Sequence, residues 1–298
     1  MTHWAADFLR QFSEARLDEP LSRYTTFRIG GPADAYIELK DRQTLAQAAA
    51  FCRARAVALT PLGFGSNVLI LDAGVRGVVF RLRGDFETVD FLAGRQVRAG
   101  AGVRLPQLVA LCAERGLAGI EPLAGVPGTV GGALLMNAGT RDVEIGSLVA
   151  EVEVFETSQA APRVVEKENL HFEYRRSNLD GLVVLSGLLQ LKPGDKADIM
   201  GRVQEFQQRR LQTQPIHTFN VGSTFKNPPG RFVAKLIEQA GLKGTAIGGA
   251  RISSLHANFI ENFSNAKADD VLRLVRRVRE AIQTRFGVEL ELEIKVLG

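Results

Sequence analysis

The chain has few of the residues from which covalent or metal-centred chemistry is usually built. Its 298 residues include two cysteines and four histidines. Two cysteines cannot make a disulfide framework, and because Cys52 and Cys112 both fall on the apolar face of an expected helix, we expect buried thiols. The histidines stand far apart, with no His-x-x-x-His or Cys-x-x-Cys spacing, so no metal site is expected.

Long hydrophobic runs are also missing. No stretch of 18 apolar residues occurs, so no membrane-spanning helix is expected. The N-terminal segment 1–20 carries four carboxylates and lacks the apolar core of a signal peptide. These absences predict a cytoplasmic protein.

The chain is neither strongly basic nor strongly acidic. The net charge is +4, and the basic residues are spread along the chain rather than gathered in a stripe. Nucleic-acid binders more often show a clustered basic stripe with interleaved aromatics, so this pattern favours a small anionic substrate over DNA or RNA. With 45% hydrophobic and 23% charged residues, the composition is ordinary for a globular protein of two or three domains.

Apolar periodicity predicts interleaved strands and helices. Expected strands cover 35–39, 57–62, 68–71, 78–82, 149–155, 182–191 and 288–296, and a hairpin covers 88–92 and 96–99 with its turn at 93–95. Expected helices cover 41–55, 105–115, a segment from about 199 to before Pro215, 232–240, and 268–286 with Ser264 or Asn265 as cap and Gly287 as end. The order is irregular, which favours an α+β (mixed α/β) protein over one doubly wound sheet.

Two glycine-rich loops do not match the common nucleotide motifs. The first, Gly63 to Asn67, lacks the third glycine of a Rossmann fingerprint because position 68 is valine, and no Gly-Lys-Ser/Thr follows. The second, 123–139, has five glycines in 17 residues and is not expected to form a helix interior. Such loops suit a flat, phosphate-bearing cofactor lying against backbone N–H groups, although each alone is equally consistent with a tight turn.

A third loop, Gly222 to Pro228, carries a hydroxyl, an ammonium and an amide between a glycine and a proline. The glycine and the proline both disfavour helix and strand, so a loop of fixed shape is expected. Loops that hold converging polar groups on a rigid frame often carry chemistry, whereas the plain alternative is a turn.

An ordered set of motifs then resembles a known family. The set is Thr26-Phe-Arg-Ile-Gly-Gly31, Gly63-x-Gly-Ser-Asn-Val-Leu69, Gly125-Val-Pro-Gly-Thr-Val-Gly-Gly132 with Met136-Asn-Ala-Gly139, Tyr174-Arg-Arg-Ser177, Gln214-Pro215, Gly222-Ser-Thr-Phe-Lys-Asn-Pro228, and Gly248-Gly-Ala with His256-Ala-Asn-Phe259. From about residue 20 to the C-terminus, the chain is similar to the UDP-N-acetylenolpyruvoylglucosamine reductases (MurB) of bacterial cell-wall synthesis. The short span between Tyr174 and Gly222 resembles the shorter type, which lacks an inserted substrate loop.

The resemblance implies a fold and a cofactor. Residues 1–82 and 83–194 would form an FAD site of the vanillyl-alcohol-oxidase (PCMH) type, with the C-terminal strand 287–298 as a candidate completion of the first lobe, and residues 195–298 would bind the UDP-sugar. NADPH would be the co-substrate, and no nucleic acid, membrane or obligatory protein partner is expected. The implied cofactor-binding residues are Gly63, Phe64, Gly65, Ser66, Asn67, Gly125, Gly128, Thr129, Gly131, Gly132 and Asn137.

The resemblance also implies catalytic residues. Reduction of an enolpyruvyl ether creates negative charge and requires a proton at carbon. Arg175 matches the family arginine, whose guanidinium suits a carboxylate, and Ser223 matches the family proton donor. Spacing alone does not choose Arg175 over Arg176. The implied substrate contacts are Lys226, Asn227 and His256.

The third implied catalytic residue, Glu293, is the least specific. Glu289, Glu291 and Glu293 share the polar face of the expected last strand, and a solvated face explains all three equally well. The chain departs from the family at Lys295, where arginine is usual, and at Thr140-Arg141, where the family continues Ala-Tyr-Gly.

Two other functions remain open from sequence. A flavin oxidase of the same fold would act on an alcohol and would leave the Ser223 loop without a role. A nucleotide-sugar sensor would bind the UDP-sugar without flavin, and the two glycine-rich loops argue against it.

Overall fold

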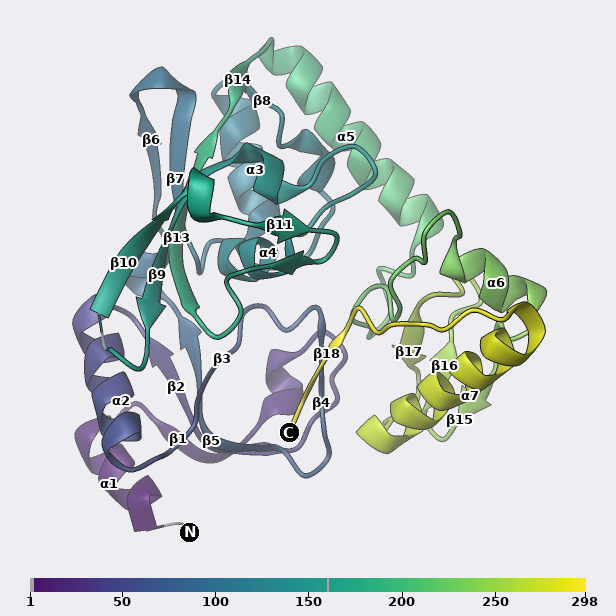
Figure 1. Cartoon of the computed structure of the whole chain (residues 1–298), viewed down its shortest axis with the longest axis horizontal. Coiled ribbons are helices and arrows are strands. Elements are labelled where there is room, and N and C mark those ends of the chain that lie inside the picture. The colour runs from purple at the N-terminus through teal and green to yellow at the C-terminus, as the bar shows by residue number, and fades with distance from the viewer. Residues whose placement is uncertain (1–2, 160) are drawn as a thin grey trace. The chain divides into compact units, whose positions relative to one another are not determined.

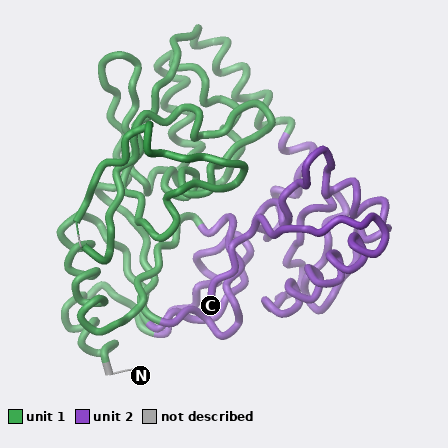
Figure 2. Tube along the Cα trace, in the orientation of Figure 1, with its two compact units in different colours: residues 1–17, 35–64, 77–209 green, residues 18–34, 65–76, 210–298 purple. Residues whose placement is uncertain are grey.

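The computed structural model describes residues 3–159 and 161–298 (Figure 1). The chain divides into two compact units, each assembled from three separate stretches of sequence (Figure 2). Unit 1 contains residues 1–17, 35–64 and 77–209, and unit 2 contains residues 18–34, 65–76 and 210–298. The three-part division expected at residues 82 and 194 stays a prediction.

Helices and strands alternate irregularly along the described chain, as an α+β fold requires. The α-helices are α1 (His3–Gln11), α2 (Arg42–Ala54), α3 (Leu105–Glu114), α4 (Val130–Met136), α5 (Lys196–Thr213), α6 (Val233–Gln239) and α7 (Ala268–Phe286). The strands are β1 (Arg16–Pro20), β2 (Pro32–Leu39), β3 (Leu59–Pro61), β4 (Val68–Ile70), β5 (Val75–Leu82), β6 (Val89–Leu92), β7 (Gln96–Gly100), β8 (Leu117–Ala118), β9 (Val149–Glu156), β10 (Ala161–Glu166), β11 (Phe172–Glu173), β12 (Arg176–Ser177), β13 (Val183–Gln190), β14 (Lys192–Pro193), β15 (Ala246–Ile247), β16 (Ala250–Ile252), β17 (Ile260–Asn262) and β18 (Lys295–Leu297). Short 3-10 helices cover Leu21–Tyr24, Gly84–Glu87, Ala93–Arg95, Glu121–Leu123, Ile145–Leu148 and Lys167–Asn169.

The first sheet has the strand order β1-β2-β5-β3, with β3 and β5 parallel. Helix α2 begins after Asp41, whose carboxylate accepts a hydrogen bond from the Thr44 backbone N–H at 2.7 Å. This is an N-cap, which satisfies a backbone donor that the first helical turn leaves unpaired. The predicted apolar face of α2 is confirmed, because Leu45, Ala48, Ala49 and Cys52 are all buried. They join a core cluster with α1 and the sheet residues of unit 1.

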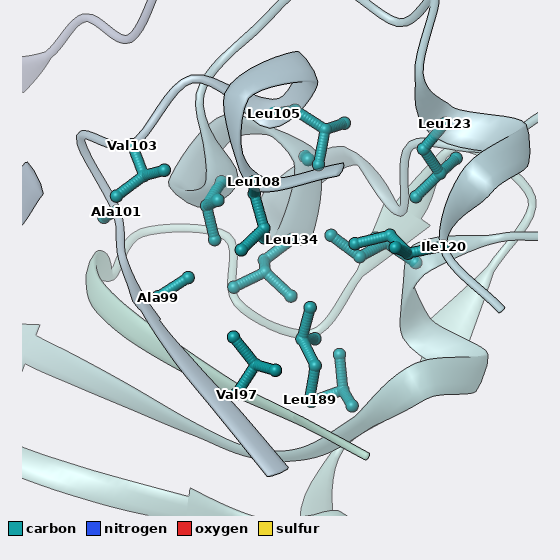
Figure 3. Close-up of a cluster of buried hydrophobic side chains, with 14 of the residues drawn as sticks. Val97, Ala99, Ala101, Val103, Leu105, Leu108, Ile120, Leu123, Leu134 and Leu189 are labelled. Carbon is teal, nitrogen blue, oxygen red and sulfur yellow. The ribbon is translucent and has the colours of Figure 1, made fainter. Parts of the chain in front are cut away.

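The second sheet is antiparallel throughout, with the order β10-β9-β13-β7-β6. The predicted hairpin is confirmed in β6 and β7, where Gly94 adopts a left-handed φ of 70° in the turn. Side chains of β7, β13, α3 and α4 point toward one another in the largest core cluster of unit 1 (Figure 3). Because Val97, Leu108, Leu134 and Leu189 have no exposed surface, α3 and α4 are fixed on this sheet by apolar burial.

The expectation that the second glycine-rich loop avoids helix is wrong for part of it. Helix α4 runs from Val130 to Met136 and contains Gly131 and Gly132. A β-carbon on Gly131 would lie 2.8 Å from the β-carbon of Ala101, so the backbone approach of α4 to the end of β7 excludes a side chain. The cap of Thr129 and this tertiary contact together outweigh the poor intrinsic helix propensity of glycine.

Unit 2 is built on helix α7, which has the predicted bounds 268–286 and ends at Gly287 in the left-handed conformation. Its cap is Lys267, not Ser264 or Asn265. The Asp270 carboxylate accepts hydrogen bonds from the backbone N–H groups of Lys267 and Gly249, so the cap lies two residues after Asn265 while the helix begins at the predicted residue. The apolar stripe of α7 packs with α6, the three-stranded sheet β15-β16-β17 and β4 in a second core.

The expected strand over 288–296 is mostly absent. Only Lys295–Leu297 form a strand, β18, which pairs in parallel with β4. The alternating pattern marks an extended segment whose hydrogen-bond partners change along its length, first the loop at 224–226 and then Asn67. Of the five apolar positions in the alternating pattern, Leu290 and Ile294 are buried, Val288 and Leu292 are half-buried and Val296 is exposed, so the predicted burial holds only in part. In the described part of the chain, no helix is long and apolar enough to cross a membrane.

The prediction of buried thiols is confirmed and has a chemical consequence. Burial raises the pKa of Cys52 to about 11 and that of Cys112 to about 12. At pH 8 the thiolate fraction of both is therefore very small, and thiolates are the reactive species. We expect no reaction of the native protein with a disulfide reagent such as DTNB, and two thiols per chain after unfolding in guanidinium. Rapid labelling of the native protein would contradict this burial.

Candidate functional site

Unit 1 contains an open cavity of about 780 Å³, part of which is continuous with solvent. The lining comes from β3 and the residues that follow it, the end of β5, the turn after β7, helix α4 with its cap, and the start of β13. Of the predicted cofactor residues, it includes Gly63, Phe64, Thr129, Gly131 and Gly132.

The cavity walls are backbone at positions where no side chain fits. A β-carbon on Gly63 would lie 2.9 Å from Thr129 Oγ1, and one on Gly102 would lie 2.7 Å from the Leu82 carbonyl oxygen. Gly131 is equally restricted by Ala101. Glycine at these positions lets the segments of the wall pack closely and leaves main chain, rather than side chains, at the cavity lining. The wall therefore fits a group such as FAD.

Three arginines add positive charge to the lining: Arg81, Arg83 and Arg104. Arg81 Nη2 donates to the Phe64 carbonyl at 3.3 Å and so fixes the backbone of the first glycine loop. Arg83 forms ion pairs with Glu38 and Glu87. Although burial opposes its charge, those two carboxylates together raise the pKa of Arg83.

Arg104 has different surroundings from the other two arginines. Its guanidinium stacks on the Phe64 ring, with the central carbon 3.4 Å from the ring centroid. Arg104 is exposed, but partial desolvation at the cavity wall, and after it the positive charge of Arg83, lowers its pKa. The lining therefore contains one arginine whose positive charge is disfavoured by its environment.

The rest of the first glycine loop belongs to unit 2. Gly65 has a left-handed φ of 77°, and a β-carbon there would lie 2.1 Å from the Tyr24 carbonyl oxygen. Asn67 Nδ2 donates to the Glu293 carbonyl at 3.0 Å, and its own carbonyl accepts from the Lys295 N–H. A predicted cofactor residue and a predicted catalytic residue are therefore in direct contact. Ser66 lies between these positions in the same unit.

Asn137 has a different environment from the other predicted cofactor residues. It ends α4 in the left-handed conformation and is 1% exposed. Its amide nitrogen donates to Glu144 and to the Glu173 carbonyl, and its oxygen accepts from the Gly146 N–H. This arrangement supports a structural role in holding the segment after α4. Gly125 and Gly128 precede the cap of α4, and the Gly128 carbonyl accepts from the Leu105 N–H at 3.0 Å.

The Ser223 loop in unit 2 is held by one buried amide. Asn258 is 4% exposed, and its side chain both accepts from the Phe225 N–H at 3.0 Å and donates to the Phe225 carbonyl at 2.8 Å. Its own carbonyl accepts from the Thr224 N–H at 2.7 Å. Sequence reasoning did not assign Asn258 a role, although it stands in the His256-Ala-Asn-Phe motif that contributed to the resemblance. Ser223 itself is half-buried and forms an isolated bridge with Phe259.

The C-terminal segment runs along the other side of this loop. The Lys226 N–H donates to the Glu291 carbonyl, and the Glu293 N–H donates to the Thr224 carbonyl, both at 2.9 Å. The structure therefore brings the segments of Ser223 and Glu293 together. It also separates the three glutamates, because Glu289 and Glu291 are exposed whereas Glu293 is half-buried.

The predicted substrate contacts lie in unit 2 with partners of their own. Lys226 Nζ forms an ion pair with Glu291 Oε1 at 2.6 Å. Asn227 is exposed, and its Oδ1 accepts from the Val233 N–H at the start of α6. His256 is half-buried, and its Nδ1 accepts from the Asn258 N–H at 3.3 Å. Burial lowers the pKa of His256, which favours the neutral imidazole.

Arg175 belongs to unit 1, whereas Ser223 and Glu293 belong to unit 2. Tyr174 and Arg175 form the two-residue turn between β11 and β12, and Arg175 has a left-handed φ of 57°. This conformation is costly for a residue with a side chain and recurs at functional sites. The Arg175 guanidinium donates to the Gly139 carbonyl at 3.0 Å. Arg175 is half-buried and Arg176 exposed, which distinguishes the two arginines.

Within residues 3–159 and 161–298, no three His, Cys, Asp or Glu side chains are grouped so that they could hold a metal ion.

Two family models match the chain. Residues 33–158 match an FAD binding domain, and residues 214–297 match the C-terminal domain of UDP-N-acetylenolpyruvoylglucosamine reductase. The first match contains most of the cavity lining, and the second contains the Ser223 loop and Glu293.

Relatives and a solved structure match nearly the whole chain. A UDP-N-acetylenolpyruvoylglucosamine reductase of Rubrobacter xylanophilus is 44% identical, over 97% of this chain and 97% of its own length. Reductase 2 of Symbiobacterium thermophilum is 42% identical, over 97% of this chain and 94% of its own length. The crystal structure of the same-named reductase (MurB) of Thermus caldophilus superposes with a TM-score of 0.83 at 41% identity, covering 96% of this chain and 98% of the other.

The close backbone approach at Gly131 generates a prediction. Gly131→Ala places a methyl group against Ala101 and should force α4 away from the end of β7. Overpacking of this kind costs roughly 1–3 kcal/mol, and we expect a lower Tm together with weaker flavin retention. Gly201→Ala is the matched control, because Gly201 lies within α5 with open space at its β-carbon position. Equal Tm and flavin content in the two variants would show that the contact at Gly131 is not restrictive.

Proposed function

The chain belongs to the UDP-N-acetylenolpyruvoylglucosamine reductase family, and on this premise we propose that it reduces the enolpyruvyl group of UDP-N-acetylglucosamine enolpyruvate. The product is UDP-N-acetylmuramate, a precursor of peptidoglycan, and NADPH is the reductant. The observation that carries the proposal is the Ser223 loop, held in a fixed shape beside Glu293 within the segment that matches the reductase C-terminal domain. Because the reaction consumes NADPH, we place it in the cytoplasm.

FAD is the cofactor that the unit 1 cavity would hold. The glycine walls at Gly63, Gly102 and Gly131 admit a flat ligand against main chain, and the arginines of the lining suit its phosphates. When bound, FAD supplies the hydride for the enolpyruvyl double bond. The protein supplies placement, charge stabilisation and the proton.

Arg175 stabilises the negative charge that develops on the substrate. The enolpyruvyl double bond is conjugated to a carboxylate, so addition of hydride gives an enolate-like charge distribution. A guanidinium binds such a group with two parallel hydrogen bonds and stays protonated at any working pH. The hydrogen bond of Arg175 to the Gly139 carbonyl holds the side chain in place before substrate arrives.

Ser223 donates the proton to carbon. A serine hydroxyl is a weak acid, but a carbanion-like carbon is basic enough to take its proton when the geometry is correct. The paired hydrogen bonds of Asn258 to Phe225 fix the loop two residues from Ser223. We assign that positioning role to Asn258.

Glu293 and the substrate contacts complete the assignment. We select Glu293 over Glu289 and Glu291 because it alone of the three is half-buried and because its backbone is fixed by both Thr224 and Asn67. Lys226, Asn227 and His256 then bind the UDP-sugar. Since Lys226 is paired with Glu291, a phosphate that approaches Lys226 must compete with that carboxylate.

Removal of the Ser223 hydroxyl should separate the two half-reactions. In Ser223→Ala, NADPH should still bleach the flavin absorbance, because that step needs no proton from Ser223. Return of the absorbance on addition of the UDP-enolpyruvyl sugar should slow by about 10²–10⁴-fold, the usual contribution of a positioned proton donor. Ser254→Ala removes an exposed serine of unit 2 and serves as control. Equal slowing of both half-reactions would remove Ser223 from the proton-donor role.

The two neighbouring arginines allow a paired test. Arg175→Gln should lower kcat by about 10²–10³-fold, as loss of a charge-stabilising donor does, with little change in the Tm. Arg176→Gln, which alters an exposed residue of β12, should change kcat by less than about threefold. Steady-state kinetics at saturating NADPH measure both effects. A larger loss in Arg176→Gln would reassign the charge-stabilising role to that residue.

A further inference from the structure

We propose that Arg104 is a cofactor-binding residue that contacts the pyrophosphate of FAD in the unit 1 cavity. The inference rests on the proposed function, in that FAD is the ligand. It assigns a contact to a residue outside the glycine motifs, in a cavity where five other positions were already expected to meet the cofactor.

Arg104 is held at the cavity wall by both its backbone and its side chain. Its backbone forms an isolated antiparallel bridge with Thr129, the cap residue of α4. Its guanidinium lies over the ring of Phe64, with the central carbon 3.4 Å from the ring centroid. A stacked guanidinium keeps its N–H edge available for hydrogen bonds in the plane of the group. The side chain is therefore oriented in advance of ligand binding.

The described residues supply no counter-ion for the charge of Arg104. Arg83, on the same lining, has its charge balanced by Glu38 and Glu87. For Arg104, neither a hydrogen bond nor an ion pair to a carboxylate occurs among the residues that the structure describes. Arg104 is exposed, but partial desolvation at the cavity wall and, after it, the positive charge of Arg83 lower its pKa. A bound anion removes that penalty, because an opposite charge nearby stabilises the charged form.

The shared chemistry is a pyrophosphate, which FAD, NADPH and the UDP-sugar all carry. The position of Arg104 selects FAD. Arg104, Phe64, Thr129 and Gly131 all lie in the stretch 33–158 that matches the FAD binding domain. The same wall has glycines where a dinucleotide would lie against main chain. Two phosphates next to Arg104 would also offset the repulsion between Arg104 and Arg83.

The experiment compares flavins that differ in whether they carry the pyrophosphate. Protein stripped of flavin is titrated with FAD and with riboflavin, and binding is followed by flavin fluorescence. Arg104→Gln should weaken the affinity for FAD by about 10- to 100-fold, the range for a charge-assisted contact. The affinity for riboflavin should change by less than about threefold. Arg104→Lys, which keeps the charge but loses the planar stack, should recover part of the FAD affinity. Added salt should weaken FAD binding less in Arg104→Gln than in the unaltered protein, because the variant lacks one charge contact.

A matched control is available within unit 1. Arg115 also stacks on a phenylalanine, Phe91, with its guanidinium carbon 3.8 Å from the ring centroid, but it is not part of the cavity lining. Arg115→Gln should leave the affinity for both flavins unchanged. This control separates loss of a stacked arginine in general from loss of the one beside the cofactor.

Several outcomes would overturn the inference. Equal weakening of FAD and riboflavin in Arg104→Gln would mean that Arg104 only shapes Phe64. Unchanged FAD affinity with a raised KM for NADPH or for the UDP-sugar would mean that Arg104 contacts the pyrophosphate of that substrate and not that of FAD. If the unaltered protein bound no flavin at all, the proposed function itself would fail, which is a different result from a variant that binds FAD normally.

Discussion

Close approach of neighbouring segments to three glycines is the constraint on which the cofactor cavity depends. At Gly63, Gly102 and Gly131, a single added carbon would meet a neighbouring segment at less than 3 Å. Glycine carries an entropic cost in the folded chain, and here it makes the backbone itself available as a wall. The first core of unit 1 then holds α4 and the end of β7 at the required separation by burying Leu134, Val97 and their neighbours. The contacts that pack the core of unit 1 therefore also set the shape of the cavity.

In unit 2, hydrogen bonds rather than close packing hold the loop that presents Ser223. A loop that presents Ser223 has few regular backbone partners, yet its buried N–H and C=O groups must be satisfied. Asn258 supplies three of those bonds from one residue, and the C-terminal segment supplies others through Glu291 and Glu293. A reactive group is therefore held in an irregular conformation without regular secondary structure.

Charge is distributed differently in the two regions. In unit 1, Arg83 is neutralised by carboxylates, whereas Arg104 has no carboxylate partner among the described residues, so the lining combines a balanced cation with an unbalanced one. In unit 2, Lys226 is already paired with Glu291. A ligand phosphate gains more from an unbalanced cation than from one whose carboxylate partner must first be displaced, and this difference supports a division between a retained cofactor and a substrate that must leave.

Elements with local residue patterns could be predicted without the folded structure. Residue spacing alone predicted the apolar stripes of α2 and α7, the β6–β7 hairpin and the buried cysteines. These features depend on residues that lie close together in the sequence. Motif order, rather than any one motif, identified the family. Tertiary structure decided the rest. Helix α4 forms despite its glycines because Ala101 lies against them, and the segment after α7 is mostly not a strand because its partners change along its length. The stacking of Arg104 on Phe64 joins residues far apart in the sequence, and only the folded chain brings such distant residues into contact.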